Sequence, residues 1–272
     1  MNDMIYKTYN PNKFLKPYIS RIFVLESKFG IHKSDFGLIA PNGRIKLVIP
    51  YKSNFNSTIN NITREHKKSS CAIIGQSTYA AEIVCDKDYG TIMVEFNPIG
   101  AYRFFKFSLN EIVNQIHNVP DVFDSVGKEL QERVSEITEI DKKVLFVEEF
   151  LYGQMVSLNK SDPVTEYAVN KIIMNNGLIN ISTLSEEVGY SRRYLLSIFT
   201  EKVGLSPKEF ACIMRFRGIY EKIHLIGMDE EKLYELYYDQ SHFIKEFKKF
   251  TGKTPGEYLN QSINLGKILL ND

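Results

Sequence analysis

Short runs of β-branched and aromatic residues, separated by Asn, Gly, Pro and Lys, dominate the first third of the chain. Runs of this kind, bounded by turn residues, predict β-strands. The expected strands cover residues 19–26, 36–40, 45–51, 72–75, 81–85 and 91–96. The polar, Asn-rich stretch over residues 52–70 predicts a mobile hairpin or loop between strands. This part of the chain is therefore expected to form a small sheet or barrel.

Beyond Pro98 the apolar residues recur at helical spacing. We expect helices over residues 102–105, 121–137 and 142–158, so that the chain switches from strands to helices once. The last of these helices carries a broad apolar strip made of Val144, Leu145, Val147, Phe150, Leu151 and Met155. The strip is wider than a lone surface helix needs, so the helix either packs on the sheet or forms a dimer seam.

Two short helices joined by a glycine-containing turn are predicted between Asn180 and Gly204. Asn180 and Ser191 are residues of the types that cap helix N-termini, and Gly189 ends the first helix before the second begins. This arrangement is typical of a helix-turn-helix. The outward face of the second helix begins with two arginines, at the end where a groove-reading helix contacts bases. It consists of Arg192, Arg193, Leu196, Ser197 and Thr200.

A further capped helix is predicted after Asp239, with Gly252 and Pro255 as its stop signals. Phe243, Phe247 and Phe250 form its apolar stripe, and its opposite face is rich in donors that can reach bases and phosphates. That face consists of Gln240, Ser241, His242, Lys245, Lys248 and Lys249. Lysine-rich faces are more often simply solvated. Between the two motifs, residues 207–224 predict a helical rod of about 25 Å that could set two helices about one DNA turn apart.

Residues from about 160 to 260 resemble the two-subdomain DNA-binding domain of the AraC/XylS family of bacterial transcription regulators. The resemblance rests on Ser191-Arg192-Arg193-Tyr194-Leu195-Leu196-Ser197-Ile198-Phe199, Gly204-Leu205-Ser206-Pro207, Asp239-Gln240-Ser241-His242-Phe243 and Gly252-Lys253-Thr254-Pro255. It implies a sequence-specific regulator that binds double-stranded DNA. The DNA-binding residues that it implies are Ser191, Arg192, Arg193, Leu196, Ser197, Gln240, Ser241, His242, Lys245, Lys248 and Lys249.

A less specific likeness links the N-terminal half to the cupin-like domain that some members of this family carry. It rests on Pro41-Asn42-Gly43-Arg44-Ile45-Lys46-Leu47, Ile74-Gly75-Gln76 and Val94-Glu95-Phe96-Asn97-Pro98. The likeness implies an α+β protein, with a β-rich sensor or dimerisation domain over residues 1–158 and a double helix-turn-helix domain over residues 159–272. It leaves a small-molecule effector, a second copy of the chain and RNA polymerase as candidate partners, and no effector-binding residue can be transferred.

One departure from the family concerns the second motif, where Leu236 runs directly into Tyr237 and Tyr238 without the usual turn glycine. A non-glycine residue in a left-handed turn costs roughly 1 kcal/mol or more. We therefore expect the helix over residues 229–236 to be displaced or frayed relative to the family pattern. This departure leaves open a degenerate relative that binds a protein partner in place of DNA.

The composition fits a cytoplasmic protein of two domains: 272 residues, 43% of them hydrophobic, allow two cores. We expect no membrane span and no signal peptide, because no apolar run approaches the roughly 20 residues that a span requires. Cys71, Cys85 and Cys212 lack metal-binding spacing, which favours reduced thiols and leaves a redox sensor as an alternative. Residues 160–272 hold fifteen Lys and Arg and fifteen Asp and Glu, which predicts modest DNA affinity.

An enzyme is the rival from another class, because barrels of this kind can hold a catalytic metal. The five histidines show no HxH or HExxH spacing, and neither a glycine-rich phosphate loop nor a nucleophile elbow occurs. We therefore expect no cofactor, no metal site and no catalytic residue. The sequence favours a regulator controlled by an effector or by dimerisation.

Overall fold

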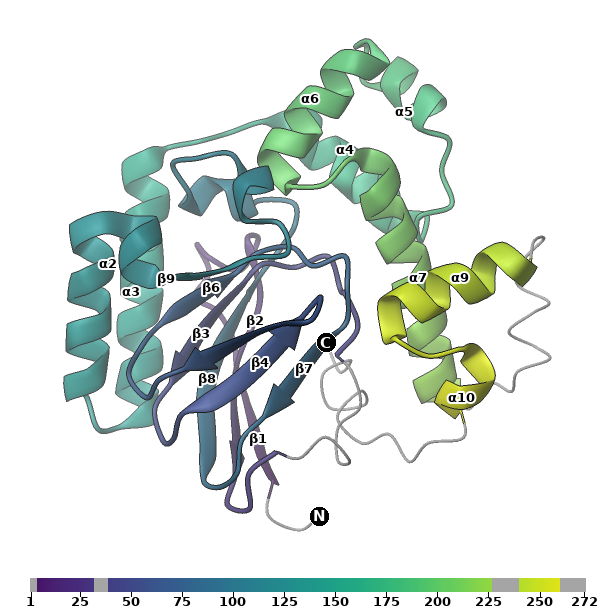
Figure 1. Cartoon of the computed structure of the whole chain (residues 1–272). Coiled ribbons are helices and arrows are strands. Elements are labelled where there is room, and N and C mark those ends of the chain that lie inside the picture. The colour runs from purple at the N-terminus through teal and green to yellow at the C-terminus, as the bar shows by residue number, and fades with distance from the viewer. Residues whose placement is uncertain (1–3, 32–38, 227–239, 260–272) are drawn as a thin grey trace.

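The computed structural model describes residues 4–31, 39–226 and 240–259. An antiparallel sheet domain with two long helices along one side forms the N-terminal half, and helices alone form the C-terminal half (Figure 1). This arrangement confirms the predicted α+β class. None of the described helices is both long enough and apolar enough to cross a membrane.

The sheet domain contains a six-stranded sheet in the order β1-β2-β8-β3-β6-β9 and a three-stranded sheet in the order β5-β4-β7. All of the strand pairs within these sheets are antiparallel. The strands are β1 (Met4–Tyr9), β2 (Ile19–Ser27), β3 (Lys46–Pro50), β4 (Phe55–Ile59), β5 (Ile62–His66), β6 (Ala72–Ile74), β7 (Ala81–Val84), β8 (Tyr89–Phe96) and β9 (Ile116–Asn118). Five of the six predicted strands are present, and most of the predicted strand over 36–40 lies outside the described residues.

Of the hairpin or loop predicted over residues 52–70, the structure confirms the hairpin, which is formed by β4 and β5. Its two-residue turn is formed by Asn60 and Asn61, with φ angles of 49° and 63°. A turn that needs positive φ at both central positions matches the twist of paired strands, and asparagine tolerates that conformation. The prediction of a single switch from strands to helices is wrong, because β9 returns to pair with β6 after the first helical turns.

Strand β8 lies at the centre of the large sheet and is buried at every residue. Its side chains alternate between two cores. Ile92, Val94 and Phe96 belong to the core beneath the helices, whereas Tyr89 and Met93 belong to the core between the two sheets.

Helices α2 (Val119–Glu136) and α3 (Ile140–Leu158) cover the outer face of the large sheet (Figure 1). Val144, Val147 and Leu151 of α3 are buried in the core beneath the helices. The packing alternative for this helix is therefore confirmed. Leu145 and Val156 remain more than half exposed, so a dimer seam stays a prediction.

The predicted helix signals in the C-terminal half are confirmed where the structure describes them. Asn180 and Ser191 cap their helices through side-chain oxygens, and Gly204 ends α6 with φ of 92°. The helices are α4 (Pro163–Met174), α5 (Ile181–Glu187), α6 (Arg192–Val203), α7 (Pro207–Ile226), α9 (Gln240–Thr251) and α10 (Pro255–Leu259). The expected helix over 229–236 and the Asp239 cap lie outside the described residues.

Polar contacts and close packing join the first helix-turn-helix to the sheet domain. Glu166 of α4 accepts hydrogen bonds from Tyr102 at 2.7 Å and from Arg103 at 2.5 Å, both in the 3₁₀ turn η1 (Ala101–Phe104). The end of α6 packs on η2 (Leu109–Ile112), where a side chain at Gly204 would lie 2.9 Å from the Leu109 carbonyl oxygen. The start of the C-terminal half is thus held against the N-terminal half by specific contacts.

Asp162 stabilises the start of the C-terminal half in two ways, and substitution can separate them. Its carboxylate accepts from the N–H groups of Val164 and Thr165 at 3.1 and 3.0 Å, and it pairs with Lys202 of α6. Asp162→Ala should lower the free energy of unfolding by about 1–2 kcal/mol, because both the cap and the ion pair are lost. Asp162→Asn keeps a capping oxygen and should lose less than about 1 kcal/mol. Urea denaturation measures both, and equal losses would contradict the capping role.

Candidate DNA-binding surface and inter-domain cavity

Helix α6 buries one face and exposes the face that sequence reasoning singled out. Leu195, Ile198 and Phe199 are in the core of the C-terminal half. The opposite side chains are all exposed; they belong to Ser191, Arg192, Arg193, Tyr194, Leu196 and Ser197. The structure therefore exposes every residue that was proposed to bind DNA on this helix, while Thr200, also expected on the outward face, is half-buried.

The proposed residues on α6 differ in what their side chains already do. The Ser191 hydroxyl accepts a hydrogen bond from the Tyr194 N–H at 3.2 Å, so it serves as the helix cap. Arg192 and Arg193 form no ion pair with the described residues. Two uncommitted guanidinium groups on the first turn can approach phosphates or base edges.

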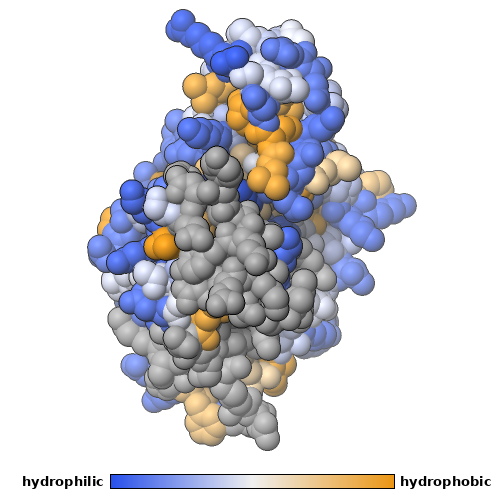
Figure 2. Space-filling view, turned by 90° about the vertical axis from the view of Figure 1, so that its right-hand side faces the viewer, coloured by the Kyte–Doolittle hydropathy of each residue, from blue (hydrophilic) through white to orange (hydrophobic). Residues whose placement is uncertain are grey.

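Helix α9 has the predicted amphipathic form. Phe243, Phe247 and Phe250 are buried, with at most 3% of their surface exposed. Ser241, Lys245, Lys248 and Lys249 are exposed on the other side, while the side chains of Gln240 and His242 lie outside the described residues. Figure 2 faces the side of the molecule that carries α9, and most of its coloured surface is hydrophilic.

Lys249 points toward the sheet domain. Its ammonium nitrogen lies 5.9 Å from the centre of the Tyr79 ring, a distance at which a cation is attracted to an aromatic face. In this arrangement Lys249 connects α9 to the sheet domain, whereas no such contact is present for Lys245 or Lys248 among the described residues.

Helix α7 joins the two candidate DNA-binding helices. Its twenty residues make a rod of about 30 Å. The Phe210 ring packs on Phe199 of α6 with centroids 5.7 Å apart. Farther along, Phe216 packs on Phe247 and Phe250 of α9 at 5.5 and 5.0 Å. Aromatic packing at two points therefore fixes α6 and α9 on one rod.

A cavity of about 100 Å³ lies between the two sheets and is closed by α7. An apolar cavity of about 150 Å³ can hold a benzene molecule, so a space of about 100 Å³ admits a smaller organic group or part of a larger one. Its walls are mainly apolar, with a few polar side chains. From the sheet domain they include Leu25, Ile31, Val48, Phe55, Ser57, Ile59, Tyr79, Ile83, Tyr89 and Met93, and from α7 Phe216, Arg217 and Tyr220.

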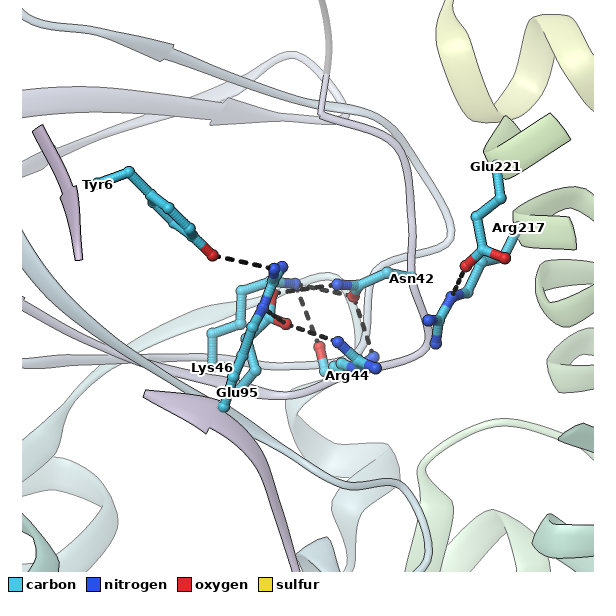
Figure 3. A network of polar contacts seen from close by, with 8 residues as sticks. Tyr6, Asn42, Arg44, Lys46, Glu95, Arg217 and Glu221 are labelled. Carbon is cyan, nitrogen blue, oxygen red and sulfur yellow. Dashed lines mark hydrogen bonds and ion pairs between the residues drawn. The ribbon is translucent and has the colours of Figure 1, made fainter. Parts of the chain in front are cut away.

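A buried polar cluster forms the end of the cavity next to α7 (Figure 3). Glu95 of β8 accepts hydrogen bonds from Arg21 at 2.8 Å, Arg44 at 2.9 Å and Asn42 at 3.1 Å. Burial alone would raise the pKa of Glu95, but Arg21, Lys46 and Arg44 outweigh it and lower the pKa to about 2. The carboxylate is therefore charged at all ordinary pH values.

Lys46 is the member of this cluster with an incomplete set of partners. Its ammonium group donates to Asn42 Oδ1 at 3.1 Å and to the Arg44 carbonyl at 3.4 Å, whereas an ammonium has three donors. No carboxylate among the described residues lies within ion-pairing distance of it. Burial lowers the pKa of Lys46, although Glu95 opposes that effect. A bound anion at this point would favour the charged amine.

Sequence reasoning missed this cavity cluster. The residues had been interpreted as turn and core positions, and Glu95 is separated from Arg21 and Arg44 by more than fifty positions in the chain. The available signal was charge inside otherwise apolar strands, since both Lys46 and Glu95 interrupt runs of β-branched residues. Buried charges of this kind are uncommon unless they are paired or functional.

The cysteine alternatives gain no support from the structure. All three cysteines are free, and Cys71 and Cys85 belong to different hydrophobic cores. Burial raises the pKa of the Cys71 thiol to about 12, which disfavours the reactive thiolate. Within the ranges that the structure describes, His, Cys, Asp and Glu form no group of three or more that could hold a metal ion.

Comparisons with known families match both halves. Residues 7–118 match a family described as "Domain of unknown function (DUF6597)", and residues 184–261 match the family described as "Helix-turn-helix domain". No curated protein matches the chain. The second match covers α6, α7 and α9, and it agrees with the helix-turn-helix domain predicted from the sequence.

Among solved structures, ToxT from Vibrio cholerae is similar over 87% of this chain and 97% of its own, with 14% identity and a TM-score of 0.48. Unsaturated fatty acid-bound ToxT from Vibrio cholerae strain SCE256 is similar over 88% and 95%, with 12% identity and a TM-score of 0.46. The AraC-like transcriptional activator CuxR is similar over 93% and 90%, with 13% identity and a TM-score of 0.28.

The Glu95 cluster predicts a pH-dependent loss of stability. Glu95→Gln should lower the free energy of unfolding at neutral pH by about 3 kcal/mol, because two buried guanidinium groups lose a charged acceptor. Folding lowers the pKa of Glu95 to about 2. The difference in free energy of unfolding between the wild type and Glu95→Gln should therefore be fully present above pH about 4.5 and fade as the pH falls toward 2. Chemical denaturation across that range measures it.

The matched control is Glu139→Gln, which removes an exposed carboxylate paired with Lys142 on the surface. An exposed pair of this kind contributes about 0–1 kcal/mol, so this variant should unfold almost as wild type does. Equal stability of the two variants at neutral pH would contradict the role assigned to the buried cluster.

Proposed function

We propose that this protein, an AraC-type helix-turn-helix regulator of transcription, binds double-stranded DNA with α6 and α9 under the control of a small anionic effector. Residues 1–158 would sense the effector and residues 159–272 would bind DNA. The observation that carries the proposal is the position of α7. It holds both candidate DNA-binding helices and also closes the cavity through Phe216, Arg217 and Tyr220.

For α6, the proposed contacts begin with Arg192 and Arg193 at the N-terminus of the helix. Arginine can bond guanine through two parallel hydrogen bonds, and Leu196, which is 47% exposed, can contact a thymine methyl group. Ser197 is exposed on the same face with shorter reach, and Ser191 would contribute through its position as the cap.

For α9, the proposed phosphate contacts come from Lys245 and Lys248, with Gln240, Ser241 and His242 at the start of the helix. Lys249 would contribute less in the conformation described, because it is directed at Tyr79. Phosphate attraction provides most of the nonspecific affinity of DNA-binding proteins. The few exposed cations on the two helices therefore support modest affinity.

The effector part of the proposal rests on the chemistry of the cavity. Apolar walls favour a hydrophobic body, and the remaining donor of Lys46 favours an anion such as a carboxylate. ToxT has been solved with an unsaturated fatty acid bound, which is a molecule of this chemical type. An effector there would contact α7 directly, so occupancy could change how α6 and α9 are held relative to the sheet domain.

Partner binding in place of DNA binding stays the alternative. Exposed Leu145, Tyr152 and Val156 on α3 are the feature that would suit a second copy of the chain, and contact with RNA polymerase is a further proposal without a specific surface. The helix-turn-helix domain itself is that of transcription regulators rather than of enzymes.

Two substitutions test the DNA-binding surface. Arg193→Ala should relax base preference and weaken specific binding by about 1–3 kcal/mol. Lys248→Ala should weaken binding to all DNA sequences alike and reduce the slope of log affinity against log salt concentration by about one. Lys28→Ala, an exposed lysine of the sheet domain, is the control and should leave binding unchanged. Gel-shift titrations with the upstream region of the protein's own gene measure these effects. Wild-type behaviour of both variants would overturn the DNA contacts.

The effector site is tested with octanoic acid and octanol as probes. The acid should raise the melting temperature of the full chain more than the alcohol does, because only the acid can pair with Lys46. Lys46→Met should remove that difference. Lys52→Met is the matched control, since Lys52 pairs with Glu26 and does not line the cavity. Equal shifts by acid and alcohol in the wild type would count against an anionic effector.

A further inference from the structure

We infer that the cavity has a second polar end, formed by Tyr89 and by Ser57 with His66, that recognises a hydroxyl group at the far end of the effector. This inference rests on the proposed function, because it concerns the same cavity. It narrows the effector to a carboxylic acid whose apolar body ends in a hydroxyl group.

One face of β8 connects the two ends of the cavity. Tyr89, Met93 and Glu95 all line it, and because side chains alternate along a strand these odd-numbered residues point the same way. Glu95 is six positions after Tyr89, which corresponds to about 20 Å along the strand. The cavity wall is thus charged at Glu95, apolar at Met93 and polar again at Tyr89.

Tyr89 carries a hydroxyl group without a well-formed hydrogen bond. The side chain is fully buried, and its Oη atom makes no hydrogen bond of ordinary length and angle within the part of the chain that the structure describes, although the Thr91 side chain interacts with it weakly. Burial also raises the pKa of Tyr89, so the group stays a neutral donor. A buried hydroxyl without a partner is unfavourable, so a ligand that supplies an acceptor there gains the bond that the protein lacks.

Ser57 and His66 supply the complementary acceptor. Ser57 lines the cavity, and its Oγ atom lies 2.7 Å from His66 Nε2. Burial lowers the pKa of His66 to about 4, with the charge of Arg64 acting in the same direction, so the ring is neutral at physiological pH. In the tautomer that accepts the Ser57 proton, the serine lone pairs remain available to the cavity.

Ring packing places these groups in one cluster. The Phe55 ring stacks on His66 with centroids 4.4 Å apart and meets Tyr89 edge-on at 5.3 Å. Phe55 and Ser57 are two residues apart on β4, so they share the face that points into the cavity. A ligand hydroxyl is both donor and acceptor, which matches a donor from Tyr89 and an acceptor from Ser57.

The test compares hexanoic, octanoic and decanoic acids with their ω-hydroxy derivatives, by calorimetric titration of the full-length protein. For the chain length that spans the cavity, the hydroxy acid should bind about three- to tenfold more tightly than the plain acid. Tyr89→Phe and Ser57→Ala should each remove that preference, so that the two acids of a pair bind each variant equally. Tyr51→Phe is the matched control, because its hydroxyl bonds Glu26 and lies outside the cavity lining, and it should keep the preference.

A second measurement does not depend on any ligand. Tyr89→Phe should unfold at the same temperature as the wild type or higher, because it removes an unpartnered buried hydroxyl. A clear loss of stability would show that the hydroxyl already has a partner and would overturn the inference. Equal affinity for both acids of every pair would overturn it as well and leave the effector proposal standing. If no acid binds at all, both proposals fail.

Discussion

The packing of Phe216, a residue of α7, against α9 is the interaction on which the functional arrangement depends. Its ring contacts Phe247 and Phe250 of α9, and the same residue lines the inter-domain cavity. A close-packed aromatic ring cannot move without displacing its neighbours, because protein interiors have few voids. Phe216 therefore belongs both to the wall of the cavity and to the packing that supports α9. Helix α6 is attached to the same helix, α7, through Phe210.

The cavity combines apolar walls with buried polar side chains, two features that usually conflict. Apolar walls exclude water, and exclusion of water makes an incompletely partnered polar group costly. The sheet domain meets this cost at Glu95 by supplying Arg21, Arg44 and Asn42. It meets the cost only in part at Lys46 and at Tyr89. Groups that a fold leaves incompletely satisfied inside a cavity are the groups a ligand can complete, which is why these two positions define the proposed ligand.

The candidate DNA-binding surface depends on which charged side chains are exposed. Charge is balanced over residues 160–272, yet the cations of α6 and α9 stand on exposed faces while acidic side chains such as Glu166, Glu187 and Glu209 take part in intramolecular contacts. Local exposure rather than net charge decides which groups can meet phosphates. The first helix-turn-helix is also held to the sheet domain by Glu166, which bonds Tyr102 and Arg103, so its orientation is coupled to that domain.

Local rules determined much of this protein. Capping residues, glycines and helical spacing located α5 to α7 and α9, because these signals act within a few residues of chain. They also placed the proposed residues of α6 on one exposed face. The short strands β1 and β9 were missed, and β4 and β5 were anticipated only as a hairpin or loop, since a strand is stabilised by partners that are distant in sequence.

Only the tertiary structure decided where the cavity lies and which polar groups face it. Glu95 meets Arg21 and Arg44 because β8 pairs with β2 and β3, and Tyr89 meets Phe55 because two sheets pack face to face. Those meetings depend on strand register and on the packing of α7, which no local pattern specifies. The sequence by itself thus determined the helix-turn-helix surface, while long-range packing determined the chemistry of the site that would control it.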